Sequence, residues 1–226
     1  MGYWSPRIAP RYFSLVGGEP TLHPELPGVV EVAASHWTDS IVQLVSNGWF
    51  LRRHSDLPAT LEKHNVHLEI SIHHDGPEYR AKIAEIRALI DEWKQSYSFK
   101  VNWRTSYGKW WRVFRGEGQT LAPYTDNNPQ LSWQNCPCRW CPQILHGRLY
   151  KCPPIAYLPM LDERFGLGRE WHPYLQYQPL PADCSEEDLT VFLTRKSEAV
   201  CGMCPAHPEP LALASPIPGR LPILTN

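Results

Sequence analysis

The sequence lacks a long apolar run, an excess of charge of either sign, and the leader pattern of a secreted protein. No stretch approaches the roughly 18 consecutive apolar residues of a membrane-spanning helix, and residues 1–10 show no charged segment followed by an apolar one. The 22 Lys and Arg residues nearly balance the 23 Asp and Glu residues, which gives no electrostatic basis for binding nucleic acid or an anionic membrane. We therefore expect a cytoplasmic protein with no nucleic-acid partner and no membrane partner.

Cysteine is also missing from more than half of the chain, since all seven cysteines lie between Cys136 and Cys204. Most of them stand in closely spaced groups, and their number is odd. This distribution favours ligation of a metal or a metal cluster in a reducing compartment over a disulfide framework. The 226 residues suffice for one domain with a full core, or for one domain and a small appendage.

The first half of the sequence alternates between strand patterns and helix patterns. The expected strands follow Arg11 and cover Ile41 to Val45, Val66 to Ile72 and Ser98 to Thr105; the expected helices lie between Pro24 and Trp37, from Ser55 or Asp56 to Lys63, and from Pro77 to about Gln95. Short links between these elements predict parallel strands with right-handed crossovers. We expect an α/β fold, a partial TIM-like (β/α) barrel of parallel strands with its functional loops at their carboxyl ends, and a small Cys-rich C-terminal domain.

Composition also suggests where the parts of the chain begin and end. We expect an N-terminal arm over 1–10, the partial barrel over 11–130, a cysteine-rich unit over 131–205 and a Pro-rich tail over 206–226. In the cysteine-rich unit, Leu149 and Tyr150 fit a hairpin strand beside Cys152. Ser185 fits the cap of a helix that leads toward Cys201.

A backbone loop follows the first expected strand at Gly17-Gly18-Glu19-Pro20. Adjacent glycines let the main chain approach a bound molecule closely and adopt positive φ at little cost. Glu19 adds a negative charge at the carboxyl end of the strand, where parallel sheets bind their ligands. Taken alone, these residues also fit an ordinary turn of an α/β protein.

This stretch resembles the motif by which radical S-adenosylmethionine (radical SAM) enzymes hold the amino group of the cofactor's methionine part. The resemblance covers about 11–205. It implies that Gly17, Gly18, Glu19 and Pro20 contact S-adenosylmethionine. Ser46 and Asn47 resemble the family's Thr-Asn-Gly at the end of the next strand, and Ser71 matches the position of a polar side chain that reaches the ribose.

The cysteine spacing is similar to that of the SPASM or twitch extension of the same family. Gly147 and Cys152 form Gly-x4-Cys after Cys141, and Cys201-Gly-Met-Cys204 supplies a close pair. The resemblance implies an auxiliary [4Fe-4S] or [2Fe-2S] cluster held by these four thiolates. Cys136 and Cys138 are alternatives to Cys141, and a zinc site with four cysteines has the same number of ligands.

The family's defining Cys-x3-Cys-x2-Cys segment is missing, since only sixteen residues precede Gly17 and none is cysteine. We expect this chain alone to be inactive in cleaving S-adenosylmethionine, because nothing in it supplies the electron. Three explanations are open: truncation of a longer enzyme, degeneration, or a partner subunit that provides the missing segment. A dimer or such a subunit would then cover the open edge of the barrel.

Two functional hypotheses follow. In the first, the chain is a truncated or degenerate radical SAM iron-sulfur protein. Its intact parent would cleave S-adenosylmethionine reductively and abstract hydrogen from an unidentified peptide or small-molecule substrate. In the second, it is a non-catalytic protein that binds zinc or a cluster through four cysteines.

Overall fold

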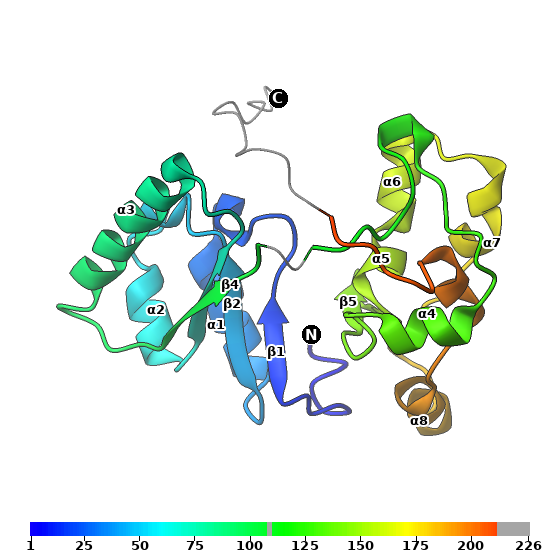
Figure 1. Ribbon diagram of the computed structural model, residues 1–226. Helices are drawn as coiled ribbons and strands as arrows, with labels where there is room; N and C mark the ends of the chain where they lie inside the picture. The colour runs from blue at the N-terminus through cyan, green and yellow to red at the C-terminus, as the bar shows by residue number, and fades with distance from the viewer. Residues whose placement is uncertain (108–109, 212–226) are drawn as a thin grey trace. The chain divides into compact units, whose positions relative to one another are not determined.

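The structure is a computed structural model that describes residues 1–107 and 110–211, and these residues form two compact units (Figure 1). The first unit covers Met1–Trp110 and the second Trp111–Leu211. The chain thus divides well before Leu131, where the sequence placed the boundary. Within the described residues, no helix is both long enough and apolar enough to cross a membrane.

The first unit contains a parallel sheet of four strands in the order β1-β2-β3-β4 (Figure 1). The strands are β1 (Tyr12–Leu15), β2 (Ile41–Ser46), β3 (His67–Ile72) and β4 (Val101–Thr105), and the helices between them are η1 (Pro20–Leu22), α1 (Leu26–His36), η2 (Leu51–Arg53), α2 (Leu57–Lys63) and α3 (Pro77–Trp93). The prediction of an α/β unit with parallel strands is confirmed.

Alternating burial explains why these segments form a sheet. In β2, Val42 and Leu44 are buried whereas Ile41 and Gln43 are only partly covered. The same alternation places Ile70 of β3 in the core. Each of the three α-helices has a proline in its first turn, where the missing amide hydrogen costs nothing.

Residues 1–10, expected to be a loose arm, fold into consecutive turns. The amide of Trp4 donates to the carbonyl of Met1 at 2.9 Å, and the amide of Ile8 donates to the carbonyl of Trp4 at 3.0 Å. The Trp4 side chain is fully buried. A single large aromatic side chain therefore anchors a segment that has no periodic pattern.

The second unit consists of short helices and one hairpin. Its elements are η3 (Gly118–Thr120), α4 (Pro129–Asn135), β5 (Gln143–Leu145), β6 (Arg148–Tyr150), α5 (Pro153–Ala156), α6 (Leu158–Phe165), η4 (Arg169–Trp171), α7 (His172–Leu175), α8 (Glu186–Thr194) and η5 (Ala199–Met203). The predicted hairpin is confirmed, and its two turn residues, His146 and Gly147, have φ values of 48° and 74°, as a type I′ turn requires. The predicted cap of α8 is also confirmed, because Ser185 Oγ accepts a hydrogen bond from the Asp188 amide at 3.0 Å.

Trp171 lies at the centre of the second unit's core. Its indole is fully buried, packs against Ile155 and Met203, and donates from Nε1 to the carbonyl of Leu121 at 3.0 Å. The start of the expected tail belongs to this unit, because the amide of Ala206 donates to Asp126 Oδ2 at 2.7 Å. The rest of the expected tail, 212–226, lies outside the described residues.

Candidate functional site

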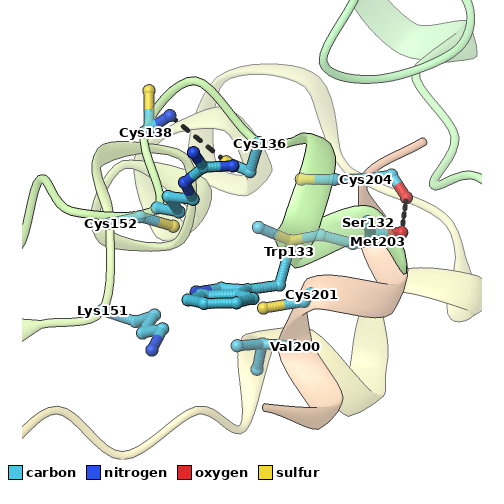
Figure 2. Close-up of a pocket in the computed structure, with 11 residues that line it drawn as sticks. Ser132, Trp133, Cys136, Cys138, Lys151, Cys152, Val200, Cys201, Met203 and Cys204 are labelled. Atoms are coloured by element: carbon cyan, nitrogen blue, oxygen red, sulfur yellow. Dashed lines mark hydrogen bonds between the residues drawn. The ribbon is translucent and has the colours of Figure 1, made fainter. Parts of the chain in front are cut away.

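Cysteines from three separate segments line one pocket in the second unit (Figure 2). They are Cys136, Cys138, Cys152, Cys201 and Cys204, and we call this the cysteine pocket. In Figure 2 the sulfur atoms of Cys152, Cys201 and Cys204 point into the space between the segments, whereas that of Cys138 points away from them. No disulfide links the chain's seven cysteines, all of which the structure describes.

Secondary structure fixes the positions of these cysteines. Cys136 follows the last turn of α4, and Cys152 stands between the end of β6 and the start of α5. Cys201 belongs to η5, and Cys204 terminates it. One helix also holds the chain around Cys204, because Ser132 Oγ of α4 donates to the Cys204 carbonyl at 2.9 Å.

Three of the four expected ligands, Cys152, Cys201 and Cys204, meet at this pocket. The fourth, Cys141, is exposed and does not line it. Both alternatives, Cys136 and Cys138, line it instead, but the Cys138 sulfur points away from the other sulfurs (Figure 2). Sequence alone could not make this choice, because the turn over 137–140 decides which of three closely spaced thiols faces inward.

Burial makes most of these thiols hard to ionise. It raises the pKa of Cys152 to about 12 and also raises the pKa values of Cys201 and Cys204. Cys136 differs, since the hydrogen bond that the Cys138 side chain donates to it lowers the pKa of Cys136 to about 7. Several thiolates can therefore gather here only when a cation balances their charge.

A buried cation already lies in the wall of the cysteine pocket. Lys151 is 8% exposed, and its Nζ donates to the carbonyls of Arg195 at 2.9 Å and Lys196 at 2.5 Å. Nζ also lies 3.5 Å from Glu198 Oε1, which is 3.1 Å from Arg195 Nε. No sequence pattern singles out Lys151 or Glu198, apart from the position of Lys151 directly before Cys152.

The cysteine sulfurs are suitable donors for a thiolate-bound metal centre, but they are not arranged closely enough around one point to coordinate an ion. Among the described residues, no three His, Cys, Asp or Glu side chains are grouped closely enough to hold a metal ion. A zinc site needs four sulfurs about 2.3 Å from one ion. The cavity of about 20 Å³ has room for roughly one water molecule. The sulfurs would have to move apart to hold a cluster and closer together to hold a single zinc ion.

The loop that resembles the S-adenosylmethionine motif lies in the first unit, at the carboxyl edge of the sheet. Gly17 and Gly18 are exposed, with φ values of 124° and 51°. Glu19 Oε1 accepts hydrogen bonds from the amide of Thr21 at 3.0 Å, from Thr21 Oγ1 at 2.6 Å and from Ser46 Oγ at 2.6 Å. Glu19 Oε2 accepts one from the Asn47 amide at 2.8 Å.

These bonds bring the expected cofactor residues together and also occupy their side chains. Ser46 Oγ accepts a hydrogen bond from the Gly48 amide at 2.8 Å, and Asn47 Oδ1 accepts one from the Trp49 amide at 2.9 Å. Glu19 thus ties the loop after β1 to the end of β2. A ligand at this edge would meet the main chain of Gly17 and Gly18 before it met the Glu19 carboxylate.

The two remaining cofactor positions lie on the same unit. Pro20 is the first residue of η1, directly after the Glu19 cap. Ser71 lies in β3, one residue before its end, and is 7% exposed. Both residues thus lie near the ends of their segments.

No protein-family model matches this sequence, and a search of curated proteins gives no match. Function is therefore inferred from the geometry of the two sites.

We predict that Glu19→Ala lowers the free energy of unfolding by about 2 kcal/mol, as measured by urea denaturation. The substitution removes four hydrogen bonds to a charged acceptor and leaves the buried hydroxyls of Thr21 and Ser46 without this partner. The matched control is Glu25→Ala, an exposed carboxylate on the same segment, which should change stability by less than about 0.5 kcal/mol. Equal effects of the two substitutions would contradict the role given to Glu19.

We also predict that the metal-free protein loses stability as the pH rises from about 8.5 to 10. The pKa of Cys152 is raised in the fold, so folding favours the neutral thiol, and this contribution is complete below the thiol's ordinary pKa near 8.5. Above that pH the unfolded chain ionises first, and the contribution falls until the pH reaches about 12. Urea denaturation at several pH values should show this slope, and Cys152→Ala should flatten it.

Proposed function

We propose that this chain is an iron-sulfur protein of the radical SAM type whose second unit holds an auxiliary cluster. The ligands would be Cys136, Cys152, Cys201 and Cys204. A single observation carries the proposal: cysteines that lie far apart in the sequence converge on one pocket from three segments. Four thiolates are the number that a [4Fe-4S] or [2Fe-2S] cluster takes from a protein.

The residues around the pocket support a centre with excess negative charge. Lys151 supplies a buried ammonium group in the pocket wall, and its bonds to two carbonyls fix its position. Trp133 and Met203 line the same pocket and limit access of water. When bound, the cluster would supply one-electron transfer, and the chain's own groups would bind it and balance its charge.

The first unit is compatible with the same family and extends the proposal. Its four parallel strands are adjacent in chain order, as in a (β/α) barrel, and we propose that they form part of such a barrel. The exposed main chain of Gly17 and Gly18 would hold the amino group of S-adenosylmethionine. The sequence contains no Cys-x3-Cys-x2-Cys segment, so we expect no 5′-deoxyadenosine from this chain alone with dithionite.

The test is anaerobic reconstitution of the full chain with iron and sulfide, followed by gel filtration and analysis of protein-bound iron, zinc and acid-labile sulfide. We expect iron and sulfide in comparable amounts, together with the visible absorption of a cluster. Bound zinc without labile sulfide would overturn the proposal.

That outcome would favour the second candidate, a non-catalytic zinc protein. One observation speaks for it: the cavity of about 20 Å³ is closer to the size of a single ion than to that of a cluster. The spacing of the donor side chains argues against a zinc site, because no three of the described donor side chains are grouped around one point. The metal analysis separates the two candidates directly.

A further inference from the structure

Two cysteines of the segment between α4 and β5 are not needed by the proposed ligand set. Cys138 and Cys141 belong to Cys138-Arg139-Trp140-Cys141, a Cys-x-x-Cys sequence in a turn. In Figure 2 the Cys138 sulfur points away from the sulfurs that face the centre of the cysteine pocket. Cys141 is exposed and does not line that pocket.

The backbone brings this pair within the distance of a disulfide. The Cys141 amide donates to the Cys138 carbonyl at 3.0 Å, which is the first-to-fourth hydrogen bond of a β-turn. The end residues of such a turn have Cα atoms less than about 7 Å apart, and disulfides join Cα atoms that are about 4.4 to 6.8 Å apart.

The surroundings of the turn leave one thiol open to solvent and keep the other near the pocket. Trp140, between the two cysteines, is 65% exposed, while its ring packs edge-on against Trp133 with 5.3 Å between the centroids. The amide of Cys138 donates to Cys136 Sγ at 3.3 Å. An oxidant in solution can thus reach Cys141 more readily than Cys138, which is partly buried.

We propose that Cys138 and Cys141 form a redox-active dithiol that exchanges with low-molecular-weight disulfides such as oxidised glutathione. The Cys141 thiolate attacks one sulfur of oxidised glutathione, forms a mixed disulfide and releases one glutathione thiolate. The thiol of Cys138 then passes its proton to the first released glutathione thiolate and attacks the Cys141 sulfur, and the second glutathione leaves. Two electrons pass from the two cysteines to the two glutathione molecules, which also take up the two protons.

The dithiol shares no residue with the proposed ligand set, because neither Cys138 nor Cys141 belongs to that set. A Cys-x-x-Cys dithiol exchanges readily when one thiol is accessible and the second is held close to resolve the mixed disulfide. The turn provides both conditions. Oxidation would close a short loop directly after Cys136 and so restrict the segment that carries this pocket thiol.

The test uses the full chain in anaerobic mixtures of reduced and oxidised glutathione, quenched by alkylation and mapped by peptide mass spectrometry. We expect the first intramolecular disulfide to join Cys138 and Cys141. Cys141→Ser should reduce the yield of intramolecular disulfide at least tenfold, whereas Cys184→Ser should leave it unchanged. A first disulfide between Cys136 and Cys138, or one that includes Cys152, Cys201 or Cys204, would overturn the proposal, as would the absence of any.

A second measurement distinguishes this inference from the proposed function. Cys141→Ser should bind as much iron as the unmodified chain after reconstitution. Loss of iron in this variant would show that Cys141 is a ligand, which overturns the dithiol but leaves the iron-sulfur proposal standing. If the unmodified chain binds no iron, the iron-sulfur proposal is wrong. The dithiol is then still tested by the disulfide map of the unmodified chain. That map does not depend on whether the variants fold.

Discussion

Replacing Cys201 and Cys204 together by alanine is expected to reduce the iron bound after anaerobic reconstitution at least tenfold. Both thiols lie in the cysteine pocket, and in Figure 2 their sulfurs point toward that of Cys152. Only two of the four proposed ligands, Cys136 and Cys152, would remain, too few for a cluster that takes four thiolates from the protein. Iron and labile sulfide per chain, measured after gel filtration, give the result directly.

The matched control is Cys184→Ala, which changes a partly buried cysteine that does not line the pocket. It should keep the iron content of the unmodified chain. Circular dichroism of each variant before loading shows whether the fold survives. A well-folded double variant with undiminished iron would place the metal centre elsewhere.

Lys151→Met is expected to lower the free energy of unfolding by about 3 kcal/mol. The substitution leaves Glu198, which is 12% exposed at its side chain, with Arg195 as its remaining ion-pair partner. It also removes the donor that the carbonyls of Arg195 and Lys196 share. Removing one partner of a buried ion pair lowers the free energy of unfolding by more than the intact pair contributed, because the remaining partner, here Glu198, stays buried.

The comparison variant is Lys196→Met, which alters an exposed side chain and keeps the main-chain carbonyl that accepts from Lys151. Its unfolding free energy should lie within about 0.5 kcal/mol of that of the unmodified chain. Urea denaturation measures both. The role given to Lys151 would be wrong if the two variants had the same stability.

The sheet was predictable from sequence because its signals are local. Alternating burial in β2, and glycine and proline at the ends of segments, mark each strand and helix without knowledge of the rest of the fold. The turn of the hairpin at His146 and Gly147 is similarly local, because Gly147 adopts its positive φ at little cost. Predictions of this kind depend on only a few neighbouring residues.

The cysteine pocket was only partly predictable, because its composition depends on contacts between distant segments. Cys136, Cys138 and Cys141 have the same side chain, and only the direction of the turn that links them separates an inward thiol from an outward one. Lys151 carried no signal beyond its place in the chain, since its partners lie on a segment more than forty residues away. The boundary at Trp110 and Trp111 was missed for a related reason, as Trp111 pairs with Pro210.

The hydrogen bonds from α4 to the segment around Cys204 have a consequence for the kinetics of metal exchange. Ser132 holds the carbonyl of Cys204, and Asn135 Nδ2 donates to the carbonyl of Ala206 at 2.7 Å. This wall of the pocket is therefore already assembled before any ion arrives. The opposite wall begins at Cys136, where α4 gives way to an exposed turn. Opening of that turn would set the rates at which a metal enters and leaves, while the rest of the unit stays folded.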